Sequence, residues 1–291
     1  MGALLIVNPQ ASRVTDELVA RVRTELPPDT EVVRTVAPGM AGAIAAEREG
    51  SVDAIFVLAG DGTYNEVVNG VTDAVPLGFL PGGGTSVLPR ALGLGRDPVV
   101  AARRAVAGGR RSIGLGRVNG RRFAFNAGVG FDAELVRRID AKGRRADGRR
   151  PGDLAFVSAA ARLVAARRGR FASELEIEGI GRAAFALVAN CDPYTYAGPT
   201  PIHVARGASF DLGLDLVAPE EIRARGVPRL LAELARGARP RPGLIVLHDA
   251  ERFVVHCDRP LPLQVDGEDL GAVDIAVFES EPRAVTALVP H

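Results

Sequence analysis

Apolar, strand-like runs alternate with helix-like stretches over about the first 110 residues of the chain. Residues 54–58 are continuously apolar, which suits a strand buried on both faces, and residues 4–7, 31–36 and 77–80 predict further strands. Helices are expected over 41–49 and 98–106. A further helix is expected where Val14, Leu18, Val22 and Leu26 recur every four residues and would share one face. Strands that alternate with helices form a parallel sheet with helices on its faces. The sequence therefore predicts an N-terminal α/β domain.

The second part of the chain has a different texture. Polar and apolar residues alternate over 121–126, 183–189 and 251–256, as in strands with one wet face. Helices are expected at 133–139, 153–168 and 219–236. We therefore expect a nucleotide-binding α/β domain over 1–115 and a mainly antiparallel β-rich domain with helices over 116–277. The tail from about 278 to 291 is a candidate to return to the first domain.

Charge and composition exclude several classes of protein. The 291 residues carry a formal net charge of +1, so no global field attracts nucleic acid. Cys191 and Cys257 have no metal-ligand spacing. The apolar start is too short for a signal peptide, and no run reaches the roughly 18 apolar residues of a membrane helix. These features predict a cytoplasmic protein without nucleic-acid partners.

The sharpest motif is LAGDGTYNEVVNG at residues 58–70, which leaves a buried strand through two glycines and enters a helix. Glycines let backbone N–H groups approach phosphate oxygens, and a helix N-terminus adds positive potential. We therefore expect Gly60, Gly62 and Thr63 to cradle phosphate. Asp61 would lie at the Mg²⁺ and triphosphate end, because a hard cation prefers carboxylate and phosphate oxygens. A plain strand-to-helix turn is the alternative.

This string resembles the GGDGTxNEVxNG signature of the diacylglycerol kinase and sphingosine kinase family, with Ala59 in place of the first glycine. Other segments resemble the family's motifs in the same order along the chain. They are residues 6–12, Thr35 with 38–39, and residues 125–133, 192–196, 208–215 and 265–268. The resemblance implies a Rossmann-like first domain of the NAD kinase and diacylglycerol kinase type. It also implies an ATP-dependent lipid kinase that uses Mg²⁺ and acts on a membrane lipid such as diacylglycerol, a sphingoid base, ceramide or phosphatidylglycerol.

The resemblance also implies roles for individual residues. Glu268 matches the family's general base, with a water-facing hairpin turn as the alternative. Asp132 matches an acid that links the catalytic site to the metal, and a helix N-cap is its alternative. Nucleotide binding is implied for Asn8, Ser12, Thr35 and Glu66. Asp211 and the carbonyl groups of Ala208 and Gly213 match a second-domain Mg²⁺ site, with Asp215 close by, and a simple turn aspartate is the alternative.

One segment departs from the family's PxG(T/S)xNxxAR pattern. The ungapped match over residues 81–90 puts Gly84 at the threonine or serine position and Ser86 at the asparagine position. Thr85 would then supply the hydroxyl from one place along. This departure predicts low or altered nucleotide affinity.

The stretch 137–150 is strongly basic and is expected to be a loop. Its arginines Arg137, Arg138, Arg144, Arg145, Arg149 and Arg150 suit a peripheral contact with an anionic membrane at the inner face, or with nucleotide phosphates. A solvated loop is the alternative, and a homodimer stays open. The four histidines, His203, His248, His256 and His291, have no ligand spacing and are expected to be structural or exposed.

Two other functions remain open at this point. An NAD kinase shares the glycine-aspartate-glycine loop and the Rossmann-like domain, although residues 65–70 and 266–268 resemble the lipid kinases. A non-catalytic lipid-binding regulatory protein is suggested by Gly84 and Ser86. Asp61, Asp132, Asp211 and Glu268 together favour an enzyme.

Overall fold

The computed structural model describes residues 2–140, 170–221, 226, 229, 233 and 238–291. The chain divides into two compact units, Met1–Leu115 with Pro282–His291, and Gly116–Glu281. Two long strands run from one unit into the other, β5 (Gly109–Val118) and β16 (Glu268–Val289). The second unit therefore forms from one continuous segment, whereas the first needs both ends of the chain.

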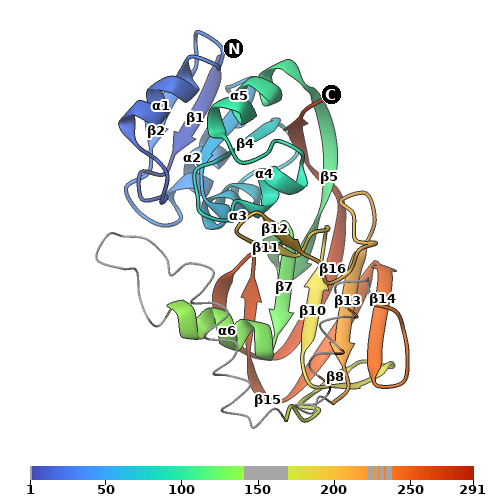
Figure 1. The fold of residues 1–291 in the computed structure, drawn as a ribbon. Helices are drawn as coiled ribbons and strands as arrows, with labels where there is room; N and C mark the ends of the chain where they lie inside the picture. The colour runs from blue at the N-terminus through green and yellow to red at the C-terminus, as the bar shows by residue number, and fades with distance from the viewer. Residues whose placement is uncertain (1, 141–169, 222–225, 227–228, 230–232, 234–237) are drawn as a thin grey trace. The chain divides into compact units, whose positions relative to one another are not determined.

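Unit 1 is built on a parallel sheet in the order β2-β1-β3-β4, and the end of β16 lies parallel beside β4 (Figure 1). Its strands are β1 (Ala3–Val7), β2 (Glu31–Arg34), β3 (Ala54–Ala59) and β4 (Leu77–Pro81). All residues of β1 and β4 are buried, as expected where helices cover both faces. The parallel sheet predicted from the alternation of strands and helices is confirmed.

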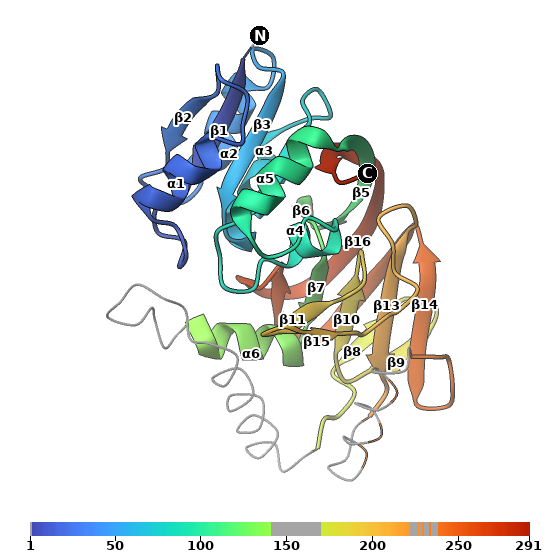
Figure 2. The ribbon, with the colours of Figure 1, turned by 45° about the horizontal axis from the view of Figure 1, so that its top comes forward.

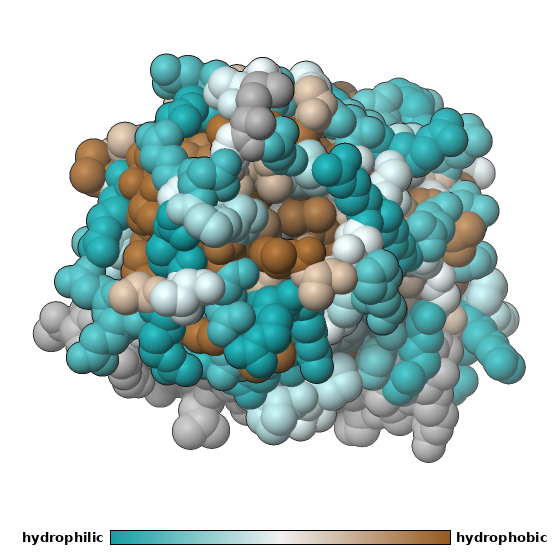
Figure 3. Space-filling view, turned by 90° about the horizontal axis from the view of Figure 1, so that it is seen from above, coloured by the Kyte–Doolittle hydropathy of each residue, from teal (hydrophilic) through white to brown (hydrophobic). Residues whose placement is uncertain are grey.

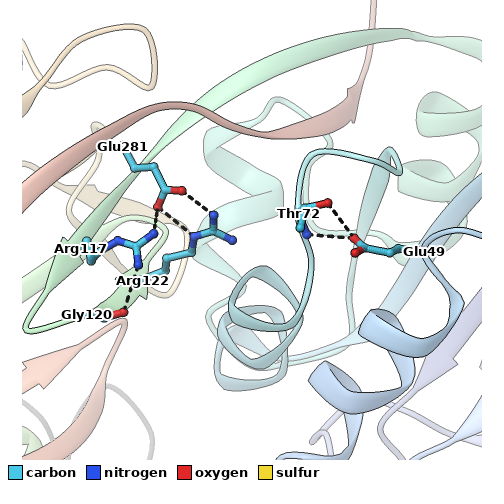
Figure 4. Close-up of polar contacts among 6 residues, drawn as sticks. All are labelled: Glu49, Thr72, Arg117, Gly120, Arg122 and Glu281. Carbon is cyan, nitrogen blue, oxygen red and sulfur yellow. Dashed lines mark hydrogen bonds and ion pairs between the residues drawn. The ribbon is translucent and has the colours of Figure 1, made fainter.

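The helices of unit 1 are α1 (Asp16–Arg23), α2 (Met40–Arg48), α3 (Asp61–Gly70), α4 (Val87–Ala91) and α5 (Pro98–Ala107). Helix α2 packs on α3 and α1 packs on α5. Local signals fix several ends: the Thr15 side chain accepts from Leu18 N–H, and Asp97 accepts from Val99 and Val100 N–H. The loop between α3 and β4 is held by Glu49, whose Oε2 accepts from Thr72 N–H at 2.8 Å (Figure 4).

Unit 2 is mainly antiparallel, as predicted, in the order β14-β13-β10-β7-β15-β16 (Figures 1 and 2). Its other elements are β6 (Arg121–Phe123), β7 (Asn126–Val129), α6 (Phe131–Asp140), β8 (Leu175–Ile177), β9 (Gly181–Ala183), β10 (Ala186–Ala189), β11 (Thr195–Ala197), β12 (Thr200–Ile202), β13 (Leu214–Pro219), β14 (Leu244–Ala250) and β15 (Arg252–Val265). The rings of Phe253 and Phe278 stack at 5.0 Å in its core, and Phe123 meets Phe278 edge-on.

An ion-pair cluster joins β5, β6 and β16 within unit 2. Glu281 accepts from Arg117 at 2.6 Å and from Arg122 Nε at 2.8 Å (Figure 4). The hydrogen bond from Arg122, with help from Arg117, lowers the pKa of Glu281. This cluster therefore stabilises the strands just before the chain enters unit 1.

One predicted element is corrected at its start. Residues 214–219 form β13, so the helix predicted at 219–236 does not begin at Pro219. Arg229 and Glu233 are helical, and most of 220–236 lies outside the described residues. The helix predicted at 153–168 lies outside the described residues too, whereas α6 confirms the helix predicted at 133–139.

Large hydrophobic side chains are exposed at scattered positions in both units: Val32, Val36, Val100, Val106, Ile180, Ile202, Leu212, Leu270 and Ile275. Hydrophilic side chains cover most of the face in Figure 3, and apolar side chains gather near its middle. Single exposed apolar side chains are normal in folded proteins. No described helix is long and apolar enough to span a membrane.

Candidate active site

The predicted phosphate-binding residues lie at the carboxyl edge of the parallel sheet in unit 1. Asn8 follows β1 directly, and Gly60 follows β3. The strands are all parallel, but β2 is added on one side of β1, and β3 and β4 are added on the other side. The order of the strands therefore reverses between β1 and β3. Ligands of open α/β sheets bind outside the carboxyl ends of the strands at such a switch point. The topology therefore places these two loops where a ligand is expected.

A hydrogen bond joins the two loops across this switch point. Asn8 Nδ2 donates to Thr63 Oγ1 at 2.8 Å, while Asn8 Oδ1 accepts from Gln10 N–H at 2.9 Å. The backbone N–H of Asn8 donates to Leu58 at the end of β3. Both ends of the Asn8 amide are thus engaged, which fixes its orientation beside the start of α3.

Helix α3 begins at Asp61 with Gly60 as its N-cap, and no side chain caps it. Four N–H groups at the start of a helix lack partners within the helix, and the helix dipole makes this end positive. Thr63, in its first turn, is buried. An uncapped start that follows a buried strand suits a phosphate group.

Glycines let the loop after β4 approach the loop after β3. Gly82 N–H donates to Ala59 carbonyl at 2.7 Å, and Arg13 N–H donates to Gly82 carbonyl at 3.0 Å. A Cβ atom on Gly83 would lie 2.8 Å from Gly60 Cα, closer than side chains are found. The three loops after β1, β3 and β4 are therefore held together by backbone contacts that only glycine permits.

Asp61 takes part in this arrangement through its side chain. Its Oδ1 accepts from Leu88 N–H at 3.3 Å, at the start of the short helix α4. The loop between them turns at Ser86, which is buried with a φ of 49° and donates to Gly83 carbonyl at 3.2 Å. Left-handed backbone suits asparagine better than serine, so the departure from the family pattern at position 86 carries a conformational cost.

The other residues predicted to bind nucleotide surround the same edge. Ser12 lies near Gly84, because a Cβ built on Gly84 would be 3.9 Å from Ser12 Oγ. The carbonyl of Thr85 accepts from Arg90 at 3.4 Å. Thr35 is buried directly after β2, and its N–H donates to Val7 carbonyl.

Glu66 has a structural contact of its own within unit 1. Its Oε2 accepts from Ala41 N–H at 3.2 Å, in the first turn of α2. The N-cap of α2 is Gly39, which offers no capping side chain. Glu66 therefore supplies the cap from α3, whereas its part in nucleotide binding stays a prediction.

In unit 2 the predicted general base lies beside a tight hairpin. Val265 pairs with Glu268, so the turn between β15 and β16 contains just Asp266 and Gly267, with φ values of 47° and 81°. Such values belong to a type I′ turn, for which Asp-Gly is a favoured sequence. The Glu268 side chain is 34% exposed and lies 4.0 Å from Arg121. It is accessible enough to meet a substrate.

Asp132 belongs to a polar cluster inside unit 2. Its Oδ2 accepts from Tyr194 OH at 2.7 Å and from Gln264 Nε2 at 2.6 Å. Burial raises the pKa of Asp132, and these two hydrogen bonds act in the opposite direction. The N-cap alternative is wrong, because α6 begins at Phe131 and the carboxylate faces side chains instead of the helix backbone.

The residues predicted to form a second-domain metal site lie around β13. Asp211 is exposed and its N–H donates to Ser209 Oγ at 3.3 Å, and the nearby Ala208 is buried. Gly213 N–H donates to Asp249. The buried Asp215 accepts from Asp249 N–H and faces His248 Nδ1 at 2.9 Å. Among the described residues, no three His, Cys, Asp or Glu side chains gather to hold a metal ion.

The predicted basic loop is corrected at its start. Arg137 and Arg138 lie in α6, and each pairs with a carboxylate. Arg137 binds Asp269 through two hydrogen bonds of 2.9 and 3.1 Å, and Arg138 pairs with Glu134 one turn away. Arg144, Arg145, Arg149 and Arg150 lie outside the described residues.

Three features of unit 2 were not anticipated from the sequence. His203 Nδ1 lies 2.8 Å from the carboxylate of Asp192, and His203 is largely buried. Gln264 is buried and connects Asp132 with the hairpin turn. Asp266 is buried and bonded to backbone N–H groups. The Asp-Gly pair signals a turn, but no local pattern indicates partners about 140 residues away.

Comparison with known proteins shows which family the N-terminal part of the chain resembles. Residues 2–118 match the family model described as diacylglycerol kinase catalytic domain. A protein named diacylglycerol kinase from Bacillus subtilis (strain 168) is 36% identical over 149 residues. That alignment spans 48% of this chain and 49% of the relative, so the chain matches about half the length of this curated relative.

Solved structures show the likeness of the fold. A diacylglycerol kinase structure from Bacillus anthracis str. Sterne has a TM-score of 0.72 at 20% identity, over 99% of this chain and 96% of that chain. An NAD kinase from Archaeoglobus fulgidus in complex with ATP has a TM-score of 0.53 at 14% identity, over 99% of this chain and 94% of that chain. These structures confirm the predicted fold type.

Proposed function

Since residues 2–118 match the model of the diacylglycerol kinase catalytic domain family, we propose that the chain is an ATP-dependent lipid kinase. The proposed reaction transfers the γ-phosphate of ATP to a hydroxyl group of a membrane lipid such as diacylglycerol. A relative named diacylglycerol kinase matches 48% of the chain, and the lipid acceptor is part of the proposal.

The observation that carries this proposal is the glycine-lined edge of the parallel sheet. The hydrogen bond from Asn8 to Thr63 joins two loops beside the uncapped start of α3. Gly82 and Gly83 bring a third loop against them. This arrangement presents backbone N–H groups and positive helix potential, both of which favour the phosphates of a nucleotide.

The residues of this edge fit ATP with Mg²⁺. Mg²⁺ keeps several waters and needs only one or two protein carboxylates when substrate phosphates supply further oxygens. Asp61, at the start of α3, offers one carboxylate, and its Oδ1 already accepts from Leu88 N–H. Asp61 would therefore contribute its carboxylate to binding of the cation, and the cation would neutralise charge on the phosphates.

Glu268 is the proposed general base. Its carboxylate would accept the proton from the lipid hydroxyl as that oxygen bonds to the γ-phosphorus and the bond from phosphorus to the β–γ bridging oxygen breaks. The hairpin turn projects this side chain from the start of β16 with one third of its surface exposed. Asp132, in its polar cluster, is proposed to support this region.

The site in unit 2 that includes Asp211 is a proposed second position for Mg²⁺, with carbonyl oxygens of Ala208 and Gly213. Asp215 would first have to leave His248 and Asp249 N–H to join it. We further propose a cytoplasmic protein that meets the membrane peripherally to reach its lipid, with no nucleic-acid partner. Sedimentation of the protein would show whether it forms a homodimer.

The proposal is tested by incubating the protein with ATP labelled at the γ-phosphate and a panel of lipids in mixed micelles. NAD serves as a competing acceptor, because an NAD kinase shares the fold. Label that moves to a lipid supports the proposal. Label that moves to NAD favours the alternative, and tight lipid binding with no transfer of label favours a non-catalytic binding protein.

A further inference from the structure

The hairpin that carries Glu268 is bonded to the rest of unit 2 by the residue at its tip. The type I′ turn at Asp266 and Gly267 would form equally well with asparagine or glycine at the first position. Asp266 is nevertheless buried, with only 4% of its surface exposed. Burial of a charged group at a turn is costly unless the group is fully paired. The turn conformation alone therefore does not explain this residue.

Three backbone N–H groups pair with the Asp266 carboxylate. Oδ2 accepts from Ala124 at 2.7 Å, and Oδ1 accepts from Phe125 at 3.0 Å and from Asn126 at 3.2 Å. The N–H of Asp266 donates back to Asn126 carbonyl at 2.8 Å. A carboxylate accepts on both oxygens, whereas an amide has one accepting oxygen. Aspartate therefore matches these donors in a way that asparagine cannot.

Further bonds hold the residues on either side of Glu268. Gln264 Oε1 accepts from Gly267 N–H at 2.9 Å, while its Nε2 donates to Asp132. On the other side, Asp269 forms two hydrogen bonds with Arg137 of α6. The residues before and after Glu268 are thus fixed to two different elements of unit 2.

We propose that Asp266 is a positioning residue for Glu268, with Arg137 as a second support through Asp269. The carboxylate of Asp266 holds the hairpin tip on the backbone of residues 124–126, and this contact fixes the direction in which the chain presents Glu268. The expected effect of Asp266 on turnover rests on the proposed function, in which Glu268 is the general base. The anchor itself is a matter of hydrogen bonds and can be measured without any activity.

The primary variant is Asp266→Asn, which keeps the size of the side chain and the preference for the turn. Its amide places a donor where one oxygen now accepts. The chain offers a matched control in the turn between β5 and β6, where Val118 pairs with Arg121 around Asn119 and Gly120, with φ values of 48° and 87°. Asn119 donates to Ile275 carbonyl and accepts from Val277 N–H. Asn119→Asp therefore makes the reverse exchange in the same kind of turn.

Asp266→Asn is expected to lower kcat by at least about tenfold while KM for ATP and lipid stays within a few fold, because about 1 Å of misplacement has large effects on catalysis. Asn119→Asp should leave kcat within about twofold. A matching loss in the control, or a loss confined to KM, overturns the positioning role. If Asp266→Asn does not fold, Arg137→Gln removes the second support, and kcat unchanged from the parent in that variant overturns the proposal.

A double variant tests whether Asp266 acts through Glu268. Groups that act as a unit are not additive in their effects on catalysis. In a Glu268→Gln background, Asp266→Asn should cost less than about a further twofold in kcat. A further loss as large as in the parent shows that Asp266 acts independently of Glu268 and overturns the inference.

Hydrogen exchange separates the anchor from the proposed function. Asp266→Asn should speed exchange of the Ala124 and Phe125 amides by at least about tenfold, and Asn119→Asp should not. Unchanged exchange overturns the anchor. Faster exchange in a protein that phosphorylates no lipid would retain the anchor and reject the kinase function together with its catalytic consequence.

Discussion

Replacing Gly83 by alanine tests the close approach of two loops at the proposed nucleotide edge. The added Cβ would lie 2.8 Å from Gly60 Cα, whereas ordinary contacts begin near 3.4 Å, so one loop must move by roughly half an ångström. The backbone cannot move freely, because Gly82 is bonded to Ala59 at 2.7 Å and to Arg13 at 3.0 Å. Overpacking of this kind costs about 1–3 kcal/mol.

Gly84→Ala is the matched control for this change. A Cβ at Gly84 meets nothing closer than Ser12 Oγ at 3.9 Å, so this variant shows only the effect of alanine on the unfolded chain. That effect stabilises by about 0.4–1 kcal/mol. The difference between the two variants therefore isolates the contact with Gly60.

The assay is urea denaturation of both variants, followed by calorimetric titration with ATP and Mg²⁺. We expect the free energy of unfolding of Gly83→Ala to lie about 1–3 kcal/mol below that of Gly84→Ala, and its ATP affinity to fall. Equal stability of the two variants, together with equal ATP affinity, would refute the claim that backbone contact builds this edge.

Three further predictions concern acidic side chains. Asp61→Asn should keep the bond from Leu88 N–H and the fold, yet lower Mg²⁺-dependent turnover at least about 10²-fold; normal turnover at saturating Mg²⁺ would reject its role. Asp132→Asn removes a buried carboxylate, and burial raises the pKa of that group, so stability at pH 7 should be unchanged or higher while turnover falls. A large loss of stability in urea would contradict this. Glu281→Gln should cost about 1–2 kcal/mol at pH 7. The pKa of Glu281 is lowered in the folded state. The stability that its ion pairs contribute is therefore complete above the unfolded glutamate pKa of about 4.3, and it disappears as pH falls through the lower, folded pKa. A loss of stability in Glu281→Gln that persists at pH 2–3 would show that the ion pairs do not cause it.

The predictable part of the fold is the part with local signals. Continuous apolar runs such as 54–58 are strands because both of their faces are covered, and α5 begins at Pro98 after the Asp97 cap. The strand at 214–219 was missed because its burial depends on neighbours in unit 2 and its last residue, Pro219, is a common start for a helix.

The candidate site was predictable in its motifs and not in its contacts. The glycines at 60, 82 and 83 indicate turns, but the sequence does not state that Gly83 faces Gly60. Likewise, Asp266 belongs to a turn motif, while its bonds to residues 124–126 require the sheet to form first. Glu66 and Arg137 show the same limit, because their partners at Ala41 and Asp269 lie on other elements.

The most direct test of the kinase account is a comparison of the parent protein with Glu268→Gln, using γ-labelled ATP and diacylglycerol in mixed micelles. The glutamine keeps the size of the side chain but cannot take up the hydroxyl proton. A general base contributes about 10²–10⁴-fold, so label transfer should fall within that range while ATP and lipid dissociation constants stay within a few fold. Transfer by Glu268→Gln as fast as by the parent would contradict the account.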